Sequence, residues 1–280
     1  MTARTGSGGT PLGTAERWTR TNHRGRPVSL LEGPAVAAGL LAGGLVGGGS
    51  LRAAAAATVA TAGGAAFGLV DDLTEDPADR AKGLRGHLGA LAHGRLTTGG
   101  LKVLGIGATA LVAAAVATPR GPGSSRRTWA LDVLASGALV AGAANLANLL
   151  DLRPGRALKA AALCAGPLAL AGGRGAGLAG SVVGAAVAAM PDDLAGRDML
   201  GDGGANAVGA LLGTACVVDA PRPVRLTVLA GVLALTLASE RVSFTEVIAR
   251  HPVLRELDDW GRPAVEGGTV ASPLVPDAPA

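Results

Sequence analysis

Eight long apolar blocks constrain the fold of this chain more than any other feature of its sequence. Each block has 16 to 22 residues with few charges, and more polar segments separate the blocks. A helix of about 20 apolar residues crosses the hydrocarbon core of a bilayer, which is about 30 Å thick. By residue number the blocks are 29–49, 53–70, 99–118, 129–150, 157–172, 175–190, 204–219 and 224–240. We therefore predict an all-α, polytopic integral membrane helical bundle of about eight transmembrane helices.

The low charge content supports a membrane protein over a soluble one. Charged residues make up 16% of the chain and hydrophobic residues 49%, whereas soluble domains have about 25% charged residues. The alternative is a soluble α/β protein rich in Ala and Gly, but the blocks show neither β alternation nor a polar helical face. The net charge of +4 is typical of basic loops at a membrane. Because aromatic and basic residues do not alternate, we expect no nucleic-acid partner.

The sequence predicts four segments. The apolar blocks form a transmembrane domain, and the segment after it has apolar residues at helical spacing: Val247, Ile248, Leu254, Leu257 and Trp260. We expect this amphipathic segment to anchor at the membrane interface, and a docking face for a soluble partner is the alternative. The expected segments are a polar cytoplasmic N-terminal segment (1–28), the transmembrane domain (29–240), the cytoplasmic amphipathic segment (241–262) and a disordered tail (263–280) rich in Pro, Gly and Ala.

The distribution of basic residues predicts the orientation. Eight spans place both termini on one side, and that side has seventeen Arg and Lys residues against seven on the other. Cytoplasmic loops are enriched in Arg and Lys, so both termini are expected in the cytoplasm. The acidic motifs all fall on the same side as the termini. We therefore predict a multi-pass protein of the plasma membrane with its functional face in the cytoplasm.

Two acidic motifs follow apolar blocks. Asp71 and Asp72 end the second block, and adjacent carboxylates that both stay ionised usually have a cation or basic partner nearby. Asn145, Asn148 and Asp151 close the fourth block with spacings of three, which place them along one helical face. Amides donate and accept hydrogen bonds, which suits a nucleobase or sugar. The alternatives are a solvated helix end for the aspartate pair and interhelical hydrogen bonds for the asparagines.

A third motif precedes an apolar block. Gly201-Asp202-Gly203-Gly204 opens the seventh block, where glycines permit close backbone approach and a helix N-terminus offers N–H groups to phosphate. Asp202 could equally be a helix-capping residue. The polar segment between the second and third blocks contains Lys82, a candidate phosphate ligand that could instead contact anionic lipid.

Taken together, these motifs resemble those of the polyprenyl-phosphate N-acetylhexosamine-1-phosphate transferases, which include the enzyme that makes lipid I of peptidoglycan. The resemblance runs from about residue 20 to 246. The residues that support it are Arg24-Gly25-Arg26-Pro27, Phe67-Gly68-Leu69-Val70-Asp71-Asp72, Lys82, the row Asn145, Asn148 and Asp151, and Gly201-Asp202-Gly203-Gly204-Ala205-Asn206.

The resemblance implies a reaction and a set of roles. An N-acetylhexosamine-1-phosphate would pass from a UDP-sugar to a polyprenyl phosphate, releasing UMP, in cell-envelope polymer synthesis. Asp71 and Asp72 would be the catalytic pair near the lipid phosphate, and Asp202 would bind Mg²⁺. The substrate-binding residues would be Lys82, Asn145, Asn148 and Asp151. Members of the family commonly pair, so a homodimer is left open.

The chain also departs from the family pattern. Gly203-Gly204 stands where the family usually has Gly-Ser, and a late His-rich motif has only His251 as a candidate counterpart. Two further functions are therefore considered. One is a non-catalytic relative that binds polyprenyl phosphate or a partner protein. The other is a transporter, which is disfavoured because the blocks have little charge at mid-membrane.

Overall fold

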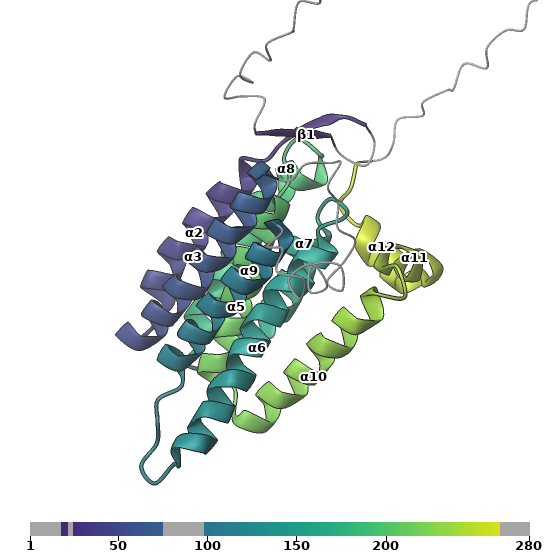
Figure 1. The fold of residues 1–280 in the computed structure, drawn as a ribbon. Coiled ribbons are helices and arrows are strands. Elements are labelled where there is room, and N and C mark those ends of the chain that lie inside the picture. The colour runs from purple at the N-terminus through teal and green to yellow at the C-terminus, as the bar shows by residue number, and fades with distance from the viewer. Residues whose placement is uncertain (1–17, 22–24, 75–97, 264–280) are drawn as a thin grey trace, which may run out of the picture.

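The structure, a computed structural model, describes residues 18–21, 25–74 and 98–263. Within these residues the fold is a helical bundle with one two-stranded antiparallel sheet (Figure 1). The strands are β1 (Thr19–Thr21) and β2 (Pro27–Ser29). The helices are α2 (Glu32–Gly47), α3 (Leu51–Thr74), α5 (Thr98–Ala117), α6 (Arg126–Leu150), α7 (Arg156–Leu170), α8 (Ala176–Leu194), α9 (Gly201–Asp219), α10 (Arg222–Ser239), α11 (Phe244–Arg250) and α12 (Pro252–Asp259).

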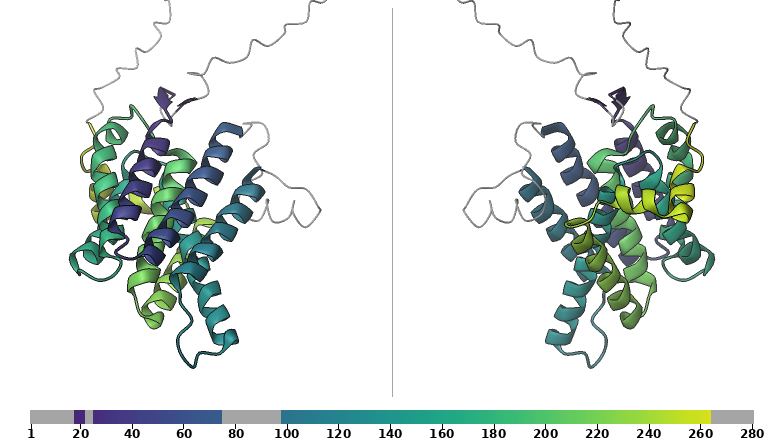
Figure 2. Two further views of the ribbon diagram at one scale, coloured as in Figure 1. Left: turned by 90° about the vertical axis from the view of Figure 1, so that its left-hand side faces the viewer. Right: turned by 90° about the vertical axis from the view of Figure 1, so that its right-hand side faces the viewer.

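Helix α9 is the centre of the bundle. Fifteen of its nineteen residues are buried, and it packs against α2, α3, α5, α6, α7 and α8. Two apolar clusters meet on it, one around Leu158, Leu178 and Leu211 and the other around Leu139 and Val140. The two side views in Figure 2 show the other helices arranged around this central one. A buried helix holds its N-terminal residues in a fixed position, so the motif at the start of α9 has a rigid support.

Small residues bring α3 and α9 into backbone contact. A Cβ atom on Gly64 would lie 2.8 Å from the carbonyl oxygen of Asn206, and one on Gly68 would overlap the carbonyl of Asp202. Close helix packing through small residues is typical of membrane bundles. The glycines of α3 therefore set the distance between the aspartate pair at its end and the start of α9.

The structure has a helix at each of the eight predicted places, but the number of spans is corrected. Within the described residues, four helices are long and apolar enough to cross a membrane, namely α3, α5, α6 and α10. Helices α2 and α7 have 16 and 15 residues, which is about 24 Å of helix or less. The last turn of helix α8 contains Pro191, Asp192 and Asp193, and α9 has Asp202 in its first turn and Asp219 at its end. The fold is all-α, and the apolar helices indicate a membrane-embedded protein.

Helix α10 leans away from the bundle and has almost no buried surface. Val232 is its one buried residue, and α6 is its main neighbour. Its exposed apolar residues include Leu226, Val228, Leu233, Leu235 and Leu237. An apolar surface of this extent is unfavourable in water and is expected to face lipid.

The β1–β2 hairpin and helices α11 and α12 lie at one end of the bundle (Figure 1). The backbone of Ser29 bonds to Arg197 and Met199, which ties the hairpin to the segment between α8 and α9. Of the predicted terminal segments, residues 1–17 and 264–280 lie outside the described residues. This end of the bundle is the one at which α3 and α6 finish and α9 begins.

Candidate functional site

The aspartate pair on α3 meets the start of α9. The Asp72 carboxylate accepts hydrogen bonds from the backbone N–H groups of Asp202, at 3.0 Å, and Gly203, at 2.9 Å. The chain enters α9 through Gly201 with a φ of 58°, a conformation that glycine adopts without strain. The first N–H groups of a helix lack intrahelical partners, so a carboxylate from another helix caps α9. Asp202, considered as the cap from sequence, is instead free to face other groups.

Lys102 of α5 joins two of the predicted aspartates. Its Nζ lies 3.1 Å from Oδ2 of Asp71 and forms an ion pair with Asp202. The Asn148 amide of α6 completes the network in the orientation that satisfies both neighbours. Its nitrogen is then 2.7 Å from Oδ1 of Asp202, and its oxygen is 3.2 Å from Nζ of Lys102. Four helices thus supply one polar network around Asp202.

A cavity of about 470 Å³ adjoins this network. That volume lies within the range of small-molecule sites. Carboxylates outnumber cations in its lining. The lining contains Asp72, Asp151, Asp193, Asp198 and Asp202, with Arg20 and Arg153 as its basic residues. The guanidinium of Arg20 also donates to the backbone carbonyl of Asp72. The cavity therefore has an excess of negative charge that a bound cation would balance.

The pKa values of Asp151 and Asp193 in the cavity wall are raised. Burial raises the pKa of Asp151 well above its usual range, and the nearby charges of Asp193, Glu32, Asp202 and Asp72 add to this effect. Burial also raises the pKa of Asp193 to about 6, although the N–H of Gly155 bonds to its carboxylate at 2.9 Å and lowers the pKa. Carboxyl groups that repel one another in a partly buried site are stabilised by a cation.

A Mg²⁺ ion would fit this site only with ligands from the substrate phosphates in addition to the protein carboxylates. Within the described residues, no group of three His, Cys, Asp or Glu side chains could hold a metal ion, and Lys102 lies between Asp71 and Asp202. Mg²⁺ is often held by one or two carboxylates together with substrate phosphates. Asp202 and Asp151, which both line the cavity, could supply such ligands. The Mg²⁺ site stays a prediction.

The structure brings most of the predicted site residues together. Asp71, Asp72, Asn148 and Asp202 share the network, and Asp151 lies at the same cavity. Asn145 lies one turn earlier in α6 and does not line the cavity. Lys82 falls outside the described residues.

Several residues of the site were not predicted from the sequence: Lys102, Arg20, Arg153, Asp193 and Asp198. The sequence position of Lys102 could have indicated its role, because an ionisable residue within an apolar span is a candidate functional residue. The sequence could also have indicated Asp193 and Asp198, since both lie in the acidic stretch just before the Gly201 motif.

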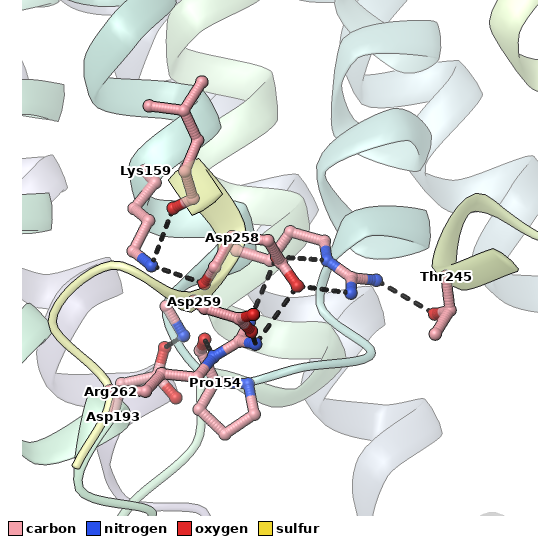
Figure 3. A network of polar contacts seen from close by, with 10 residues as sticks. Pro154, Lys159, Asp193, Thr245, Asp258, Asp259 and Arg262 are labelled. Atoms are coloured by element: carbon pink, nitrogen blue, oxygen red, sulfur yellow. Dashed lines mark hydrogen bonds and ion pairs between the residues drawn. The ribbon is translucent and has the colours of Figure 1, made fainter. Parts of the chain in front are cut away.

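The C-terminal helices are fastened beside the cavity by a second network (Figure 3). Arg156 donates to both oxygens of Asp258, at 2.7 and 2.9 Å, and to the hydroxyl of Thr245 at 3.0 Å. Lys159 donates to the carbonyl oxygen of Asp258 at 2.7 Å, and Arg262 donates to that of Pro154 at 3.0 Å. Helices α11 and α12 therefore hold the segment 151–156, which contributes Asp151 and Arg153 to the cavity.

The comparisons with known proteins add no family assignment. No protein-family model, no curated protein and no solved structure matches the chain. The motifs and the geometry of this site are therefore the observations from which a function can be inferred.

Proposed function

We propose that this protein transfers an N-acetylhexosamine-1-phosphate from a UDP-sugar to a polyprenyl phosphate, releasing UMP, at the cytoplasmic face of the plasma membrane. One observation supports this function above all others. Three motifs that the transferase resemblance singled out, on α3, α6 and α9, share one polar network beside one cavity. A site where two phosphate-bearing substrates react needs cations and orienting groups together, and this cavity has both.

In this proposal the chain's own residues orient the substrates. Arg20 and Arg153 at the cavity wall bind phosphate oxygens through their guanidinium groups. Asn148 and Lys102 fix the Asp202 carboxylate, and Asp71 and Asp72 orient the attacking lipid phosphate. Asp151, which lines the cavity, keeps its predicted substrate-binding role. Lys82 and Asn145 keep their predicted substrate-binding roles.

Mg²⁺ is the cofactor in this proposal. Asp202, with Asp151, would hold it together with the substrate phosphates. When bound, it would neutralise phosphate charge and stabilise the charge that develops on the transferred group. The excess of carboxylates in the cavity lining supports a cation at this place. A homodimer in the membrane remains compatible with the proposal.

The test is an assay of UMP release from a panel of UDP-sugars. Purified protein is supplied with polyprenyl phosphate, with and without Mg²⁺. We expect UMP release with a UDP-N-acetylhexosamine that requires both Mg²⁺ and the lipid. Asp202→Asn should abolish it without unfolding the bundle. Asp192→Asn is the matched control, since Asp192 is an exposed aspartate that pairs with Arg197 and does not line the cavity. Turnover that persists in Asp202→Asn would contradict the proposal.

A second function has one observation in its favour. The ammonium of Lys102 already pairs with Asp71 and Asp202, so one of these two negative charges is offset without a metal ion. This arrangement favours a non-catalytic relative that binds polyprenyl phosphate or a partner protein. Binding of polyprenyl phosphate without any UMP release, unchanged by Mg²⁺, would support this function over the transferase.

A further inference from the structure

A second charged region lies at the end of the bundle opposite the acidic cavity. Here α5 ends, α6 begins and α3 begins, and Figure 1 shows the α5–α6 connection projecting from this end. A cavity of about 390 Å³ lies between these elements. Its lining includes Arg52, Thr118, Arg120, Arg126 and Trp129, with no carboxylate.

A neighbouring cavity extends the same basic region. It has a volume of about 250 Å³, shares Arg52 and Pro119 with the first, and adds Arg174. Within the described residues, no carboxylate forms an ion pair with Arg52, Arg120, Arg126 or Arg174. At this end of the bundle, Asp132 pairs with Arg222 and Arg225 instead. Four guanidinium groups therefore line two adjoining cavities without an ion-pair partner among the described residues.

Two of the arginines are held in place by backbone carbonyls. Arg52 donates to Val116 at 3.1 Å, and Arg120 donates to Ser124 at 3.0 Å. Each guanidinium has five N–H groups, so these bonds leave donors for a ligand. The Thr118 hydroxyl, buried and without a hydrogen-bond partner, is a further polar group of the wall. The region therefore presents hydrogen-bond donors that the described residues leave without an acceptor.

The ligand chemistry follows from these donors and from the apolar part of the wall. Clustered guanidinium groups match phosphate oxygens in geometry and charge. Trp129 uses its indole N–H on the carbonyl of Thr118, at 2.9 Å, and its ring forms part of the wall with Ala115 and Ala130. Helices α5 and α6, both long and apolar enough to span a membrane, meet at this cavity. A ligand with a phosphate and acyl chains fits this wall better than a free phosphate ion.

The charge distribution gives a second reason for a ligand. Basic residues are disfavoured on the side of a membrane opposite the most basic loops. That side has seven Arg residues in this chain, and four of them line the two cavities. Like charges that gather at one place repel unless an anion lies between them. We infer that this basic region binds the phosphate group of an anionic phospholipid at the membrane interface away from the acidic cavity.

The test is lipid binding by the full-length protein purified in detergent, followed by native mass spectrometry. The protein is titrated with phosphatidylglycerol and, separately, with zwitterionic phosphatidylethanolamine. We expect at least a fivefold preference for phosphatidylglycerol, because the ammonium group of phosphatidylethanolamine cancels the charge of its phosphate and is repelled by the arginines. Equal affinity for the two lipids would overturn the inference.

Variants locate the site. Arg126→Gln should weaken phosphatidylglycerol binding by about tenfold, the loss expected for one charge-assisted contact. Arg126 makes no hydrogen bond within the described part of the protein, so its replacement leaves folding intact. Arg52→Gln is a second variant with the same expected result. Arg127→Gln is the matched control, since its exposed side chain is adjacent in sequence but does not line the cavity. An equal loss in Arg127→Gln would show non-specific attraction and overturn the inference.

A competition experiment separates a lipid from a free ion. Excess inorganic phosphate is added to the complex with phosphatidylglycerol. A lipid site keeps its ligand because the acyl chains contribute to binding, whereas complete displacement would assign the region to a soluble phosphate compound instead. The result is independent of the transferase proposal, because this region lies at the other end of the bundle and UMP release is not measured.

Discussion

Lys102 is the residue that connects the acidic motifs. It pairs with Asp71 of α3 and Asp202 of α9, and both the lysine and its partners are largely buried. Removing one member of a buried ion pair leaves an uncompensated charge. The lysine therefore determines whether the two carboxylates can lie this close in the absence of another cation.

We predict that Lys102→Met destabilises the bundle and makes its stability depend on a divalent cation. The expected loss is about 3 kcal/mol, typical of a broken buried ion pair, and Mg²⁺ should restore part of it by balancing Asp71 and Asp202. Thermal unfolding in detergent with and without Mg²⁺ measures both effects. Lys102→Arg is the control, because it keeps the charge and should lose less. An unchanged melting temperature in Lys102→Met would contradict the importance of this pair.

The sequence predicted the acidic side of this site better than the basic side. Asp71, Asp72 and Asp202 lie at the borders of apolar blocks, where a charged residue is easily recognised in the sequence. Lys102 lies inside a block, 31 residues from Asp71 and 100 from Asp202 along the chain. Its pairing depends on the rotation of α5 against α3 and α9, which periodicity alone does not determine. The cap that Asp72 provides to α9 was missed for the same reason, since it depends on tertiary contact.

At the scale of elements, the contact between α3 and α9 determines the geometry of the site. Gly68 lies against the carbonyl of Asp202 and the Cα of Gly203, one turn before Asp72. The carboxylate of Asp72 reaches the N–H groups of α9 because no side chain separates the two helices at this point. The close packing of α3 on α9 is therefore what allows Asp72 to cap α9.

We predict that Gly68→Ala separates α3 from α9 and weakens the capping of α9. Overpacking of this kind costs about 1–3 kcal/mol. Unfolding by denaturing detergent in mixed micelles measures the loss, and amide exchange should rise at residues 201–204. Gly107→Ala is the control, since Gly107 lies in the helix α5 with open space around it. It should raise stability by about 0.5–1 kcal/mol, the helix-propensity gain. Similar effects of the two substitutions would show that the contact is unimportant.

The docking of α11 and α12 depends on one buried carboxylate. Asp258 is mostly buried and pairs with Arg156 and Arg262. Burial opposes its ionisation, but the hydrogen bonds and charges of Arg156 and Arg262 outweigh burial and lower its pKa. A carboxyl group with a lowered pKa stabilises the folded state above its unfolded pKa of about 4, and this contribution is lost as the pH falls through the lowered value.

We predict that Asp258→Asn releases α11 and α12 from the bundle at neutral pH. The unpaired Arg156 costs about 3 kcal/mol of docking free energy, and hydrogen exchange of residues 244–262 should rise accordingly. In the unchanged protein the same rise should appear only in acid, below about pH 4. Asp259→Asn is the control, since Asp259 is 64% exposed in its pair with Arg262 and should contribute less than about 1 kcal/mol. Equal hydrogen-exchange protection of residues 244–262 in Asp258→Asn and Asp259→Asn would show that Asp258 does not fasten α11 and α12 to the bundle.

At the scale of the whole molecule, the two ends of the bundle differ in charge. The end with the motifs has a cavity with five aspartates and two arginines in its lining, and the opposite end has cavities with arginines and no carboxylate. The apolar blocks predicted the positions of eight helices to within a few residues, because block length alone limits where a helix can lie. They did not predict which helices are long and apolar enough to span, because end residues such as Asp192 and Asp193 extend α8 beyond its apolar part.

The difference in charge between the two ends of the bundle leads to a prediction of membrane orientation. The sequence predicts an excess of Arg and Lys on the side of the acidic motifs, which favours the cytoplasm for the acidic cavity. Single cysteines report the side directly when Cys164 and Cys216, the native thiols, are first replaced by alanine. Thr21→Cys lines the acidic cavity, and Ser124→Cys lies in the α5–α6 connection at the opposite end. A membrane-impermeant maleimide added to intact cells should label Ser124→Cys and leave Thr21→Cys unlabelled until the cells are opened. The reverse pattern would place the acidic cavity outside the cell, where no UDP-sugar donor is supplied, and would remove the basis of the transferase proposal.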